Sequence, residues 1–300
     1  MSTKKHFKED GMNQHHDEKK GILYMVATPI GNLEDITVRA LRVLKEVDLI
    51  AAEDTRHSRI LLSSYGIRTP LVSLHEHNER KRSALIVSKI ESGMSVAYVS
   101  DAGTPCVSDP GYHLAAAALE NGIRVVPVPG PSAVIAALSV CGFPADQFLF
   151  YGFLPPKSNR RRRFLESIKD EEQTLIFYES PARIADAMQE IHEVLGDRQV
   201  VVARELTKMF EEIRRGRVSV IAAEISGSRA RGEFTIIVQG ASREPVSITD
   251  NEIQDRLLRL RKEKSMSLRD AVEDVVRQTG LPRKRVYNMA LKIFSVSDEH

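Results

Sequence analysis

The sequence predicts an α/β fold made of two α/β domains and a short helical region at the C-terminal end. Short β-branched runs alternate with helical patterns from Ile22 onward, as in chains that fold around mostly parallel sheets. A chain of 300 residues, 42% of them hydrophobic, can build two ordinary cores. Strand patterns stop beyond Gly240. The predicted regions are a disordered leader over 1–20, an N-terminal α/β domain over 21–141, a second α/β domain over 142–244 and a helical region over 245–300.

The N-terminal domain is expected to form a mostly parallel sheet. Five apolar, β-branched runs predict strands at Ile22–Thr28, Asp48–Asp54, Leu71–Leu74, Ser95–Asp101 and Arg124–Pro129. Apolar residues at three- and four-residue spacing predict helices at Ile36–Val47, His57–Tyr65, Glu79–Ser92 and Tyr112–Asn121. Gly66, Gly93 and Gly122 follow three of these helices, where glycine is the residue typical of a helix end.

The second domain begins after a break near Cys141–Pro144. Its predicted strands are Gln147–Phe153, Thr174–Ser180, Gln199–Glu205 and Glu233–Gln239. Its predicted helices are Asn159–Ile168, Ala182–Leu195 and Val218–Ile225.

The helical region contains three predicted segments, at Asp250–Lys262, Ser267–Gln278 and Pro282–Phe294. Between the last two, Gly280 is typical of the end of one helix and Pro282 of the start of the next. Such a pair is typical either of a helix-turn-helix that binds nucleic acid or of two helices that only pack together.

Composition indicates a cytoplasmic protein without membrane contact. Cys106 and Cys141 are too few for a disulfide framework and stand in no metal-binding pair, which favours a reducing compartment. The leader lacks the apolar stretch of a signal peptide, and no run of about 18 apolar residues predicts a membrane span. The net charge of +2 is too small to indicate a nucleic-acid partner by itself.

Three loops rich in glycine, proline and small polar residues should meet at one edge of the first sheet. They follow its first, fourth and fifth predicted strands, at Thr28–Asn32, Ser100–Pro105 and Pro127–Ser132. In an open parallel sheet the ligand crevice lies at the carboxyl ends of the strands. Each loop alone could be an ordinary tight turn, but three at one edge favour a site for a small polar ligand.

Common nucleotide and hydrolase motifs are absent from the sequence. It contains no Gly-x-Gly-x-x-Gly after the first strand, no phosphate loop and no Gly-x-Ser-x-Gly elbow. His75 and His77 form an HxH pattern without a clear third ligand, so no metal site is predicted.

Seven strings in a fixed order carry a family resemblance. They are TPIGNLEDIT from Thr28, AAEDTR from Ala51, SDAGTP from Ser100, DPG from Asp109, PGPS from Pro129, FYES from Phe177 and ARELTK from Ala203. Together they resemble the ribosomal RNA small subunit methyltransferase I family, an offshoot of the tetrapyrrole methylases. The resemblance implies a homodimer whose subunits each hold S-adenosylmethionine in a cleft between the two α/β domains. It also implies methyl transfer to the 2′-oxygen of a cytidine in the decoding centre of 16S rRNA, in the small ribosomal subunit.

The resemblance implies that cofactor-binding residues lie on the three loops and on the second domain. They are Pro29, Gly31, Asp101, Ala102, Gly103, Thr104, Pro129, Gly130, Pro131, Ser132, Tyr178, Glu233 and Phe234. A cationic sulfonium with an amino-acid tail needs carboxylate or carbonyl partners, and Asp101 is the carboxylate we favour. The alternative for Asp101 is that it only caps the turn that follows its strand.

A ribose hydroxyl is a weak nucleophile, so a base or an orienting residue is expected beside it. We favour Glu53 or Asp54 for this role, and Tyr178 and Glu179 are also within reach. The alternative is that the first two carboxylates pair with Arg56 or cap helices.

Basic runs are the candidates for RNA contact. Arg160, Arg161, Arg162 and Arg163 begin a predicted helix, and Arg283, Lys284 and Arg285 lie in a stretch without acids. Clustered guanidiniums suit the phosphates of folded RNA, and Lys208 could steer another phosphate. Such runs are also common on ordinary solvated surfaces.

Two other functions stay open. A methyltransferase that acts on a tetrapyrrole would need room for a macrocycle and no basic runs. A ribosome-binding protein without catalysis would not need intact loops at Asp101–Pro105 and Pro129–Ser132.

Overall fold

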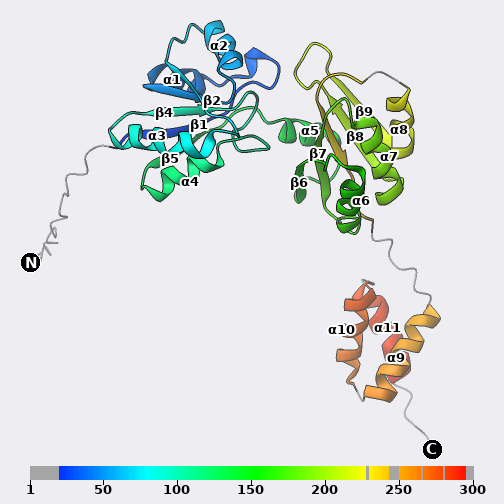
Figure 1. Cartoon of the computed structure of the whole chain (residues 1–300). Helices are drawn as coiled ribbons and strands as arrows, with labels where there is room; N and C mark the ends of the chain where they lie inside the picture. Colours follow the sequence, from blue (N-terminus) through cyan, green and yellow to red (C-terminus); the bar gives the residue numbers. More distant parts are fainter. Residues whose placement is uncertain (1–19, 228–229, 243–249, 265, 280, 295–300) are drawn as a thin grey trace, which may run out of the picture. The chain divides into compact units, whose positions relative to one another are not determined.

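The computed structural model describes residues 20–227, 230–242, 250–264, 266–279 and 281–294. Its contacts divide the chain into two compact units, Met1–Gly240 and Ala241–His300 (Figure 1). The predicted leader, apart from Lys20, lies outside the described residues, and so do the predicted boundary at residue 244 and Gly280.

The N-terminal domain is built on a five-stranded parallel sheet, as predicted. Its strand order is β3-β2-β4-β1-β5, with β1 at Ile22–Val26, β2 at Leu49–Ala52, β3 at Leu71–Ser73, β4 at Val96–Val99 and β5 at Arg124–Val128. Both β2 and β4 are buried along their whole length, because helices cover both faces of the sheet.

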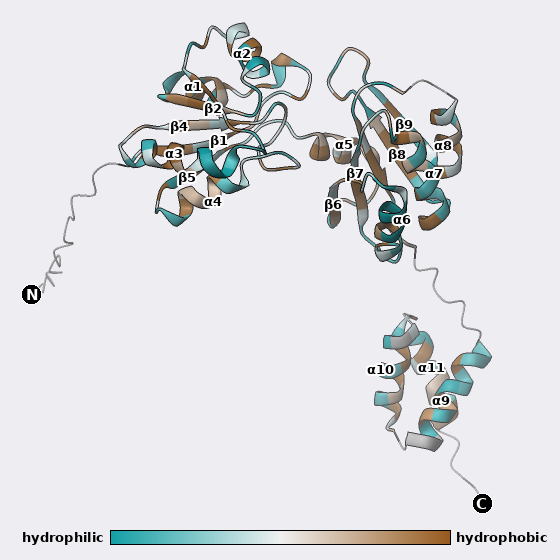
Figure 2. Ribbon diagram, viewed as in Figure 1, coloured by the Kyte–Doolittle hydropathy of each residue, from teal (hydrophilic) through white to brown (hydrophobic). Residues whose placement is uncertain are grey.

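Two pairs of helices enclose this sheet. Helices α1 (Val38–Glu46) and α2 (Thr55–Ser64) pack into the apolar core on one face, and α3 (Glu79–Glu91) and α4 (Tyr112–Glu120) into the core on the other. Figure 2 shows hydrophobic residues concentrated on the strands. Glycines with positive φ follow α2, α3 and α4, which confirms the predicted helix ends at Gly66, Gly93 and Gly122.

The second domain contains a mixed five-stranded sheet of order β6-β7-β10-β8-β9. Strands β6 (Phe148–Phe153) and β7 (Thr174–Glu179) are parallel, whereas β8 (Gln199–Arg204), β9 (Glu212–Arg217) and β10 (Phe234–Val238) form antiparallel pairs. Helices α6 (Ser158–Ser167), α7 (Ile184–Leu195) and α8 (Val218–Ser226) share one apolar core with this sheet.

Helix α5 (Ala133–Cys141) corrects the predicted domain boundary at residue 141. Its buried residues, among them Val134 and Leu138, pack against Ile176, Val201 and other residues of the second sheet. The helix therefore belongs to the core of the second domain, and the first domain ends before it.

The C-terminal unit is a three-helix cluster, as predicted. Helices α9 (Asp250–Lys264), α10 (Leu268–Thr279) and α11 (Arg283–Phe294) bury Ile253, Leu257, Ala271, Val272, Val275, Leu281, Val286 and Ala290. Ser267 accepts a hydrogen bond from the amide of Asp270 at 3.2 Å, which caps the start of α10. In the described part of the chain, no helix combines the length and the apolarity needed to cross a membrane.

The buried carboxylate of Glu79 holds the start of α4. Its Oε1 accepts hydrogen bonds from the amides of Gly111 at 2.9 Å and His113 at 2.8 Å. Gly111 has φ +121°, and a Cβ there would lie 2.5 Å from the ring of Tyr98. Glu79 therefore fixes the end of the long loop that follows β4.

Replacing Glu79 by alanine should lower the free energy of unfolding by about 2 kcal/mol, because two amides lose a charged acceptor. Urea denaturation followed by circular dichroism measures this change. Glu91→Ala, an exposed acid at the end of the same helix, is the control and should change stability by less than about 0.5 kcal/mol. Equal effects of the two substitutions would show that the hydrogen bonds of Glu79 do not stabilise the fold.

Candidate active site

The three glycine- and proline-rich loops meet at the carboxyl edge of the first sheet, as predicted. The amide of Thr28 donates to the carbonyl of Gly103 at 2.9 Å, and the amide of Gly103 donates back to Thr28 at 3.0 Å. The hydroxyl of Thr104 donates to the carbonyl of Pro131 at 3.2 Å. The first, fourth and fifth loops are thus joined by hydrogen bonds.

A cavity of about 290 Å³ opens beside these loops and is also lined by the second domain. Its lining residues are Ile30, Ala102, Gly103, Thr104, Val107, Ser108, Asp109, Ser132 and Ala133, together with Phe153, Tyr178, Glu179, Ser180, Pro181, Glu233, Phe234 and Thr235. A mostly apolar lining with a few converging polar groups is typical of a small-molecule site.

Seven of the predicted cofactor-binding residues line this cavity, and six do not. Those that line it are Ala102, Gly103, Thr104, Ser132, Tyr178, Glu233 and Phe234. Pro129 and Gly130 line a neighbouring apolar cavity of about 580 Å³, which shares Thr104, Val107 and Ser132 with the first. In the part of the chain that the structure describes, Pro29, Gly31, Asp101 and Pro131 line neither cavity.

Asp101, which was expected to bind the cofactor, is hydrogen-bonded to the neighbouring loop and is not among the residues that line the cavity. Its Oδ1 accepts a hydrogen bond from the amide of Asp54 at 3.0 Å, and its own amide donates to Oε2 of Glu53 at 3.4 Å. Asp101 therefore braces the loops after β2 and β4. Burial, and next the charge of Asp101, raise the pKa of Glu53.

Asp54 caps α2, so it is no longer a candidate base. Its Oδ1 accepts from the amide of Arg56 at 2.8 Å, and its Oδ2 forms an ion pair with the Arg56 guanidinium at 2.7 Å. These hydrogen bonds hold the pKa of Asp54 well below its usual range, and such a carboxylate is a weak base. Neither Glu53 nor Asp54 lines the cavity in the described structure.

Asp109 lines the cavity and was not among the predicted site residues. Burial, and next the charge of Glu53, raise its pKa to about 7. It follows Cys106 and Ser108, two non-glycine residues with positive φ, and such strain is common at functional sites. The DPG string that starts at Asp109 was the signal in the sequence that could have pointed to it.

Aromatic rings of the second domain form one wall of the cavity. The ring of Tyr178 lies 5.0 Å from that of Phe150 and 5.6 Å from that of Phe153. Burial, and next the charge of Asp109, raise the pKa of Tyr178 to about 12, so its hydroxyl keeps its proton near neutral pH. A flat apolar ligand group would find a packing surface here.

Lys208 is held by two carboxylates, which differs from its expected role on an RNA phosphate. Its Nζ lies 2.9 Å from Oε1 of Glu205 and 3.1 Å from Oε2 of Glu233. A Cβ at Gly31 would collide with the Lys208 side chain, so the loop after β8 lies directly on the first loop. Lys208 and Gly31 therefore help to join the two domains beside the cavity.

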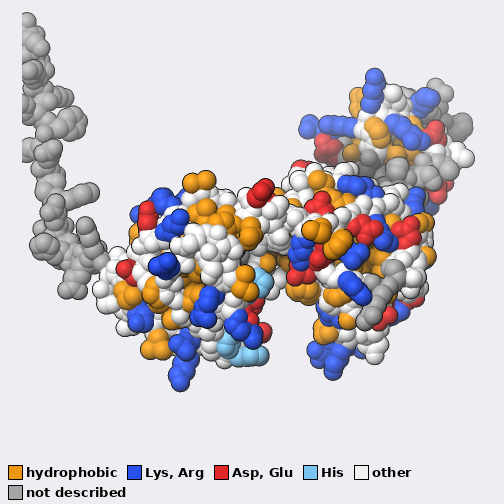
Figure 3. Space-filling view, turned by 90° about the horizontal axis from the view of Figure 1, so that it is seen from above, with side chains coloured by type: hydrophobic (Ala, Val, Ile, Leu, Met, Phe, Trp, Pro, Cys, Tyr) orange, Lys and Arg blue, Asp and Glu red, His pale blue; other side chains and the backbone are white. Residues whose placement is uncertain are grey.

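The basic run at the start of α6 divides into buried and exposed residues. Arg161 is buried, and its guanidinium pairs with Glu190 at 2.7 Å, so it is wrongly placed among the RNA contacts. Arg160, Arg162 and Arg163 are exposed, and Arg162 also forms an ion pair with Glu193. Figure 3 shows basic side chains interspersed with acidic ones over the visible face.

The basic residues of the helical region also have acidic neighbours. Arg283 lies 3.5 Å from Glu273, and Arg285 lies 2.6 Å from Asp250. Lys284 is exposed. These surface pairs leave the three residues accessible to a phosphate.

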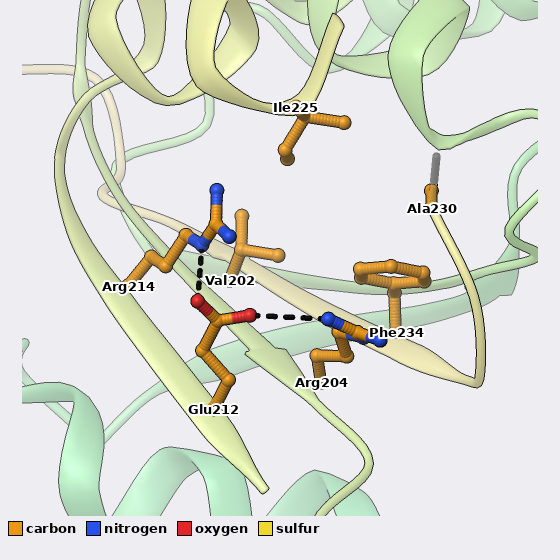
Figure 4. A pocket seen from close by; sticks show the side chains of 7 residues that line it. All are labelled: Val202, Arg204, Glu212, Arg214, Ile225, Ala230 and Phe234. Atoms are coloured by element: carbon orange, nitrogen blue, oxygen red, sulfur yellow. Dashed lines mark hydrogen bonds and ion pairs between the residues drawn. The ribbon is translucent and has the colours of Figure 1, made fainter. Parts of the chain in front are cut away.

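A third, much smaller pocket lies at the edge of the second sheet. Glu212 sits there between Arg204 and Arg214, at 3.3 and 2.8 Å (Figure 4). Its volume of about 20 Å³ holds about one water molecule, so it is a structural ion cluster and not a ligand site. Among the described residues, no group of three or more His, Cys, Asp or Glu side chains could hold a metal ion.

Comparison with known proteins identifies the family. A family model described as Tetrapyrrole (Corrin/Porphyrin) Methylases matches residues 22–222. Ribosomal RNA small subunit methyltransferase I of Escherichia coli O157:H7 is 45% identical over 286 residues, which cover 94% of this chain and 99% of that protein. The chain belongs to the ribosomal RNA small subunit methyltransferase I family. The protein of the same name from Haemophilus influenzae is also 45% identical and covers 90% of the chain and 96% of its own length.

Other matches agree with this family. A model described as RsmI C-terminal HTH domain matches residues 249–293, which favours the helix-turn-helix alternative for α10 and α11. The methyltransferase CobJ has a TM-score of 0.56 at 19% identity and covers 74% of this chain and 95% of its own. Uroporphyrin III C-methyl transferase from Thermus thermophilus has a TM-score of 0.53 at 19% identity and covers 73% of this chain and 97% of its own. These two structures confirm the predicted fold.

Proposed function

We propose that this protein transfers a methyl group from S-adenosylmethionine to the 2′-oxygen of a cytidine in the decoding centre of 16S rRNA. The cavity between the strand-end loops and the second sheet carries this proposal, because it belongs to a chain whose relatives are named as methyltransferases of small-subunit rRNA. The choice of cytidine, of the 2′-oxygen and of the decoding centre follows the family resemblance.

The cavity has the donor and acceptor set that S-adenosylmethionine needs. Glu233 supplies a carboxylate for a cationic group of the cofactor, Asp109 and Glu179 supply further acceptors, and the backbone of Ala102–Thr104 supplies amides and carbonyls. Tyr178 and Phe153 offer ring faces for a purine. When bound, the cofactor supplies an electrophilic methyl group on a sulfonium.

Asp109 is the residue we propose as the proton acceptor for the ribose hydroxyl. A base works best when its pKa lies near the working pH, and that of Asp109 is raised to about 7. The proton of the hydroxyl passes to the carboxylate as the oxygen gains its methyl group. Asp109 therefore replaces Glu53 and Asp54 in this role.

We further propose that exposed basic residues bind rRNA and that the protein acts in the cytoplasm as a homodimer, as the resemblance implies. Arg160 and Arg163 on α6 and Arg283, Lys284 and Arg285 on α11 are the proposed RNA contacts. Sedimentation of the purified protein at micromolar concentration tests the dimer, and a mass of one chain would exclude it.

Replacing Arg160 and Arg163 together by alanine should weaken binding to small ribosomal subunits while leaving cofactor affinity unchanged. A plot of log K against log salt concentration has a negative slope, and its magnitude falls by about one for each lost phosphate contact. The magnitude for the double variant should therefore be smaller by about two. Filter binding at several salt concentrations measures this slope.

The control for this pair is Lys45→Ala with Lys89→Ala. Both lysines are exposed in the last turns of α1 and α3, at the sheet edge opposite the strand-end loops. If both double variants bind like the unmodified protein, Arg160 and Arg163 are ordinary surface residues.

A methylation assay tests the proposed function. The protein is incubated with labelled S-adenosylmethionine and small subunits from a strain that lacks the enzyme, and the rRNA is digested to nucleosides. We expect label in 2′-O-methylcytidine. Label in another nucleoside would correct the substrate, and an rRNA without label would overturn the proposal.

A further inference from the structure

Glu179 is a buried carboxylate with one oxygen that has no hydrogen-bond partner. Its side chain is fully buried at the end of β7, and the residue lines the cavity. Oε1 accepts from the amide of Ser180 at 2.7 Å and forms an ion pair with Arg183 at 2.6 Å. Oε2 has no partner among the described residues. An unsatisfied buried acceptor destabilises a fold, so its presence beside a cavity needs an explanation.

The same domain contains a matched carboxylate that is fully satisfied. Glu190 is also buried and also paired with an arginine, Arg161. Its Oε2 lies 2.7 Å from Nε of that arginine, and its Oε1 accepts from the hydroxyl of Ser158 at 2.7 Å. Glu190 is not among the residues that line the cavity. Of these two carboxylates, the one with a free oxygen belongs to the residue that lines the cavity.

The charge of Glu179 is already balanced. The Arg183 guanidinium is fixed by hydrogen bonds to the hydroxyl of Ser180 at 3.2 Å and to the carbonyl of Leu154 at 3.3 Å. With a fixed cation on one oxygen, the other oxygen is suited to a neutral donor such as a hydroxyl more than to a second cation.

We propose that Oε2 of Glu179 accepts a hydrogen bond from a ribose hydroxyl of the bound ligand. This inference rests on the proposed function, in which both ligands carry a ribose. The hydroxyl comes either from the cofactor or from the target nucleotide. In either case Glu179 is a ligand-binding residue, and its second oxygen is satisfied only in the complex.

The test compares Glu179→Gln with Glu190→Gln, because each removes one buried negative charge paired with an arginine. Calorimetry with S-adenosylhomocysteine gives cofactor affinity, and initial rates on small subunits give kcat/KM. If the cofactor supplies the hydroxyl, Glu179→Gln should weaken S-adenosylhomocysteine binding about tenfold. If the nucleotide supplies it, cofactor affinity should stay within about twofold while kcat/KM falls about tenfold. Glu190→Gln should leave both values within about twofold of the unmodified protein.

Deoxy analogues sharpen the cofactor arm. The 2′-deoxy and 3′-deoxy forms of S-adenosylhomocysteine each lack one hydroxyl. The analogue that lacks the hydroxyl bound by Glu179 should bind the unmodified protein more weakly than S-adenosylhomocysteine does. In Glu179→Gln the same analogue and S-adenosylhomocysteine should bind equally well. If Glu179→Gln does not fold, Glu179→Asp keeps the charge beside Arg183 and withdraws the acceptor.

The inference is overturned if the Glu179 variant matches Glu190→Gln in both assays. A failure of the proposed function has a different signature, since the unmodified protein would then either not bind S-adenosylhomocysteine or not methylate small subunits.

Discussion

Replacing Arg161 by alanine should lower the free energy of unfolding by about 3–5 kcal/mol, because the substitution leaves buried Glu190 with only the more distant cation of Arg162, at 3.8 Å. Both side chains are buried, and two guanidinium nitrogens donate to the carboxylate, at 2.7 and 3.0 Å. Urea denaturation followed by circular dichroism is suitable, since the chain has no tryptophan.

Two comparisons isolate the cause of this loss. Arg163→Ala removes an exposed arginine from the same helix and should change stability by less than about 0.5 kcal/mol. The double variant Arg161→Met with Glu190→Leu should recover most of the stability, because neither charge is then buried. An Arg161→Ala protein as stable as Arg163→Ala would contradict the buried pair.

Replacing Asp109 by asparagine should lower the methyl transfer rate by about 10²–10⁴-fold, which is the usual contribution of a general base. In the unmodified protein the rate should rise with pH through about 7 as the carboxylate forms, and the residual rate of the variant should lack this rise. Single-turnover rates at several pH values measure both effects. A variant with the unmodified rate and pH profile would remove Asp109 from catalysis.

The same substitution has a second, independent readout in stability. The folded pKa of Asp109 is raised above its ordinary value of 3.8, so the proton favours the folded state. This contribution is complete below about pH 4 and is lost as pH rises through about 7. Asparagine cannot lose a proton, so Asp109→Asn should be more stable than the unmodified protein at about pH 8. Asp146→Asn, at an exposed position, should show no such gain.

Most of the fold could be predicted from the sequence, because periodicity follows directly from burial. The elements that were missed have physical reasons. Helix α5 is almost wholly apolar and therefore lacks the alternation that marks a surface helix. Strand β9 has the sequence EIRRGR. Charged residues on an edge strand protect the sheet from pairing with another chain, but they hide the apolar pattern by which a strand is predicted. Arg214 of β9 pairs with Glu212 of the same strand and with Glu224 of α8, and folding is needed to bring Glu224 near.

The candidate site could be predicted only in part. The loops were predicted because glycine and proline mark tight strand-end turns, and their hydrogen bonds confirm that they meet. The direction of a side chain is not encoded in such patterns. Asp101 therefore turned out to brace a loop, and Asp109 lines the cavity instead. Arg161 looked like its neighbours in the run, but one helical position turns it toward Glu190.

A crystal structure of the protein with S-adenosylhomocysteine tests the central claim most directly. The claim is that the cavity of about 290 Å³ between the strand-end loops and the second sheet holds the cofactor. We expect the adenosyl group in this cavity, against the backbone of Ala102–Thr104 and the ring of Tyr178. Beside Glu179 we expect either a ribose hydroxyl of the cofactor or free space into which the target nucleotide can enter. An adenosyl group bound in any other pocket, with this cavity left open, would contradict it.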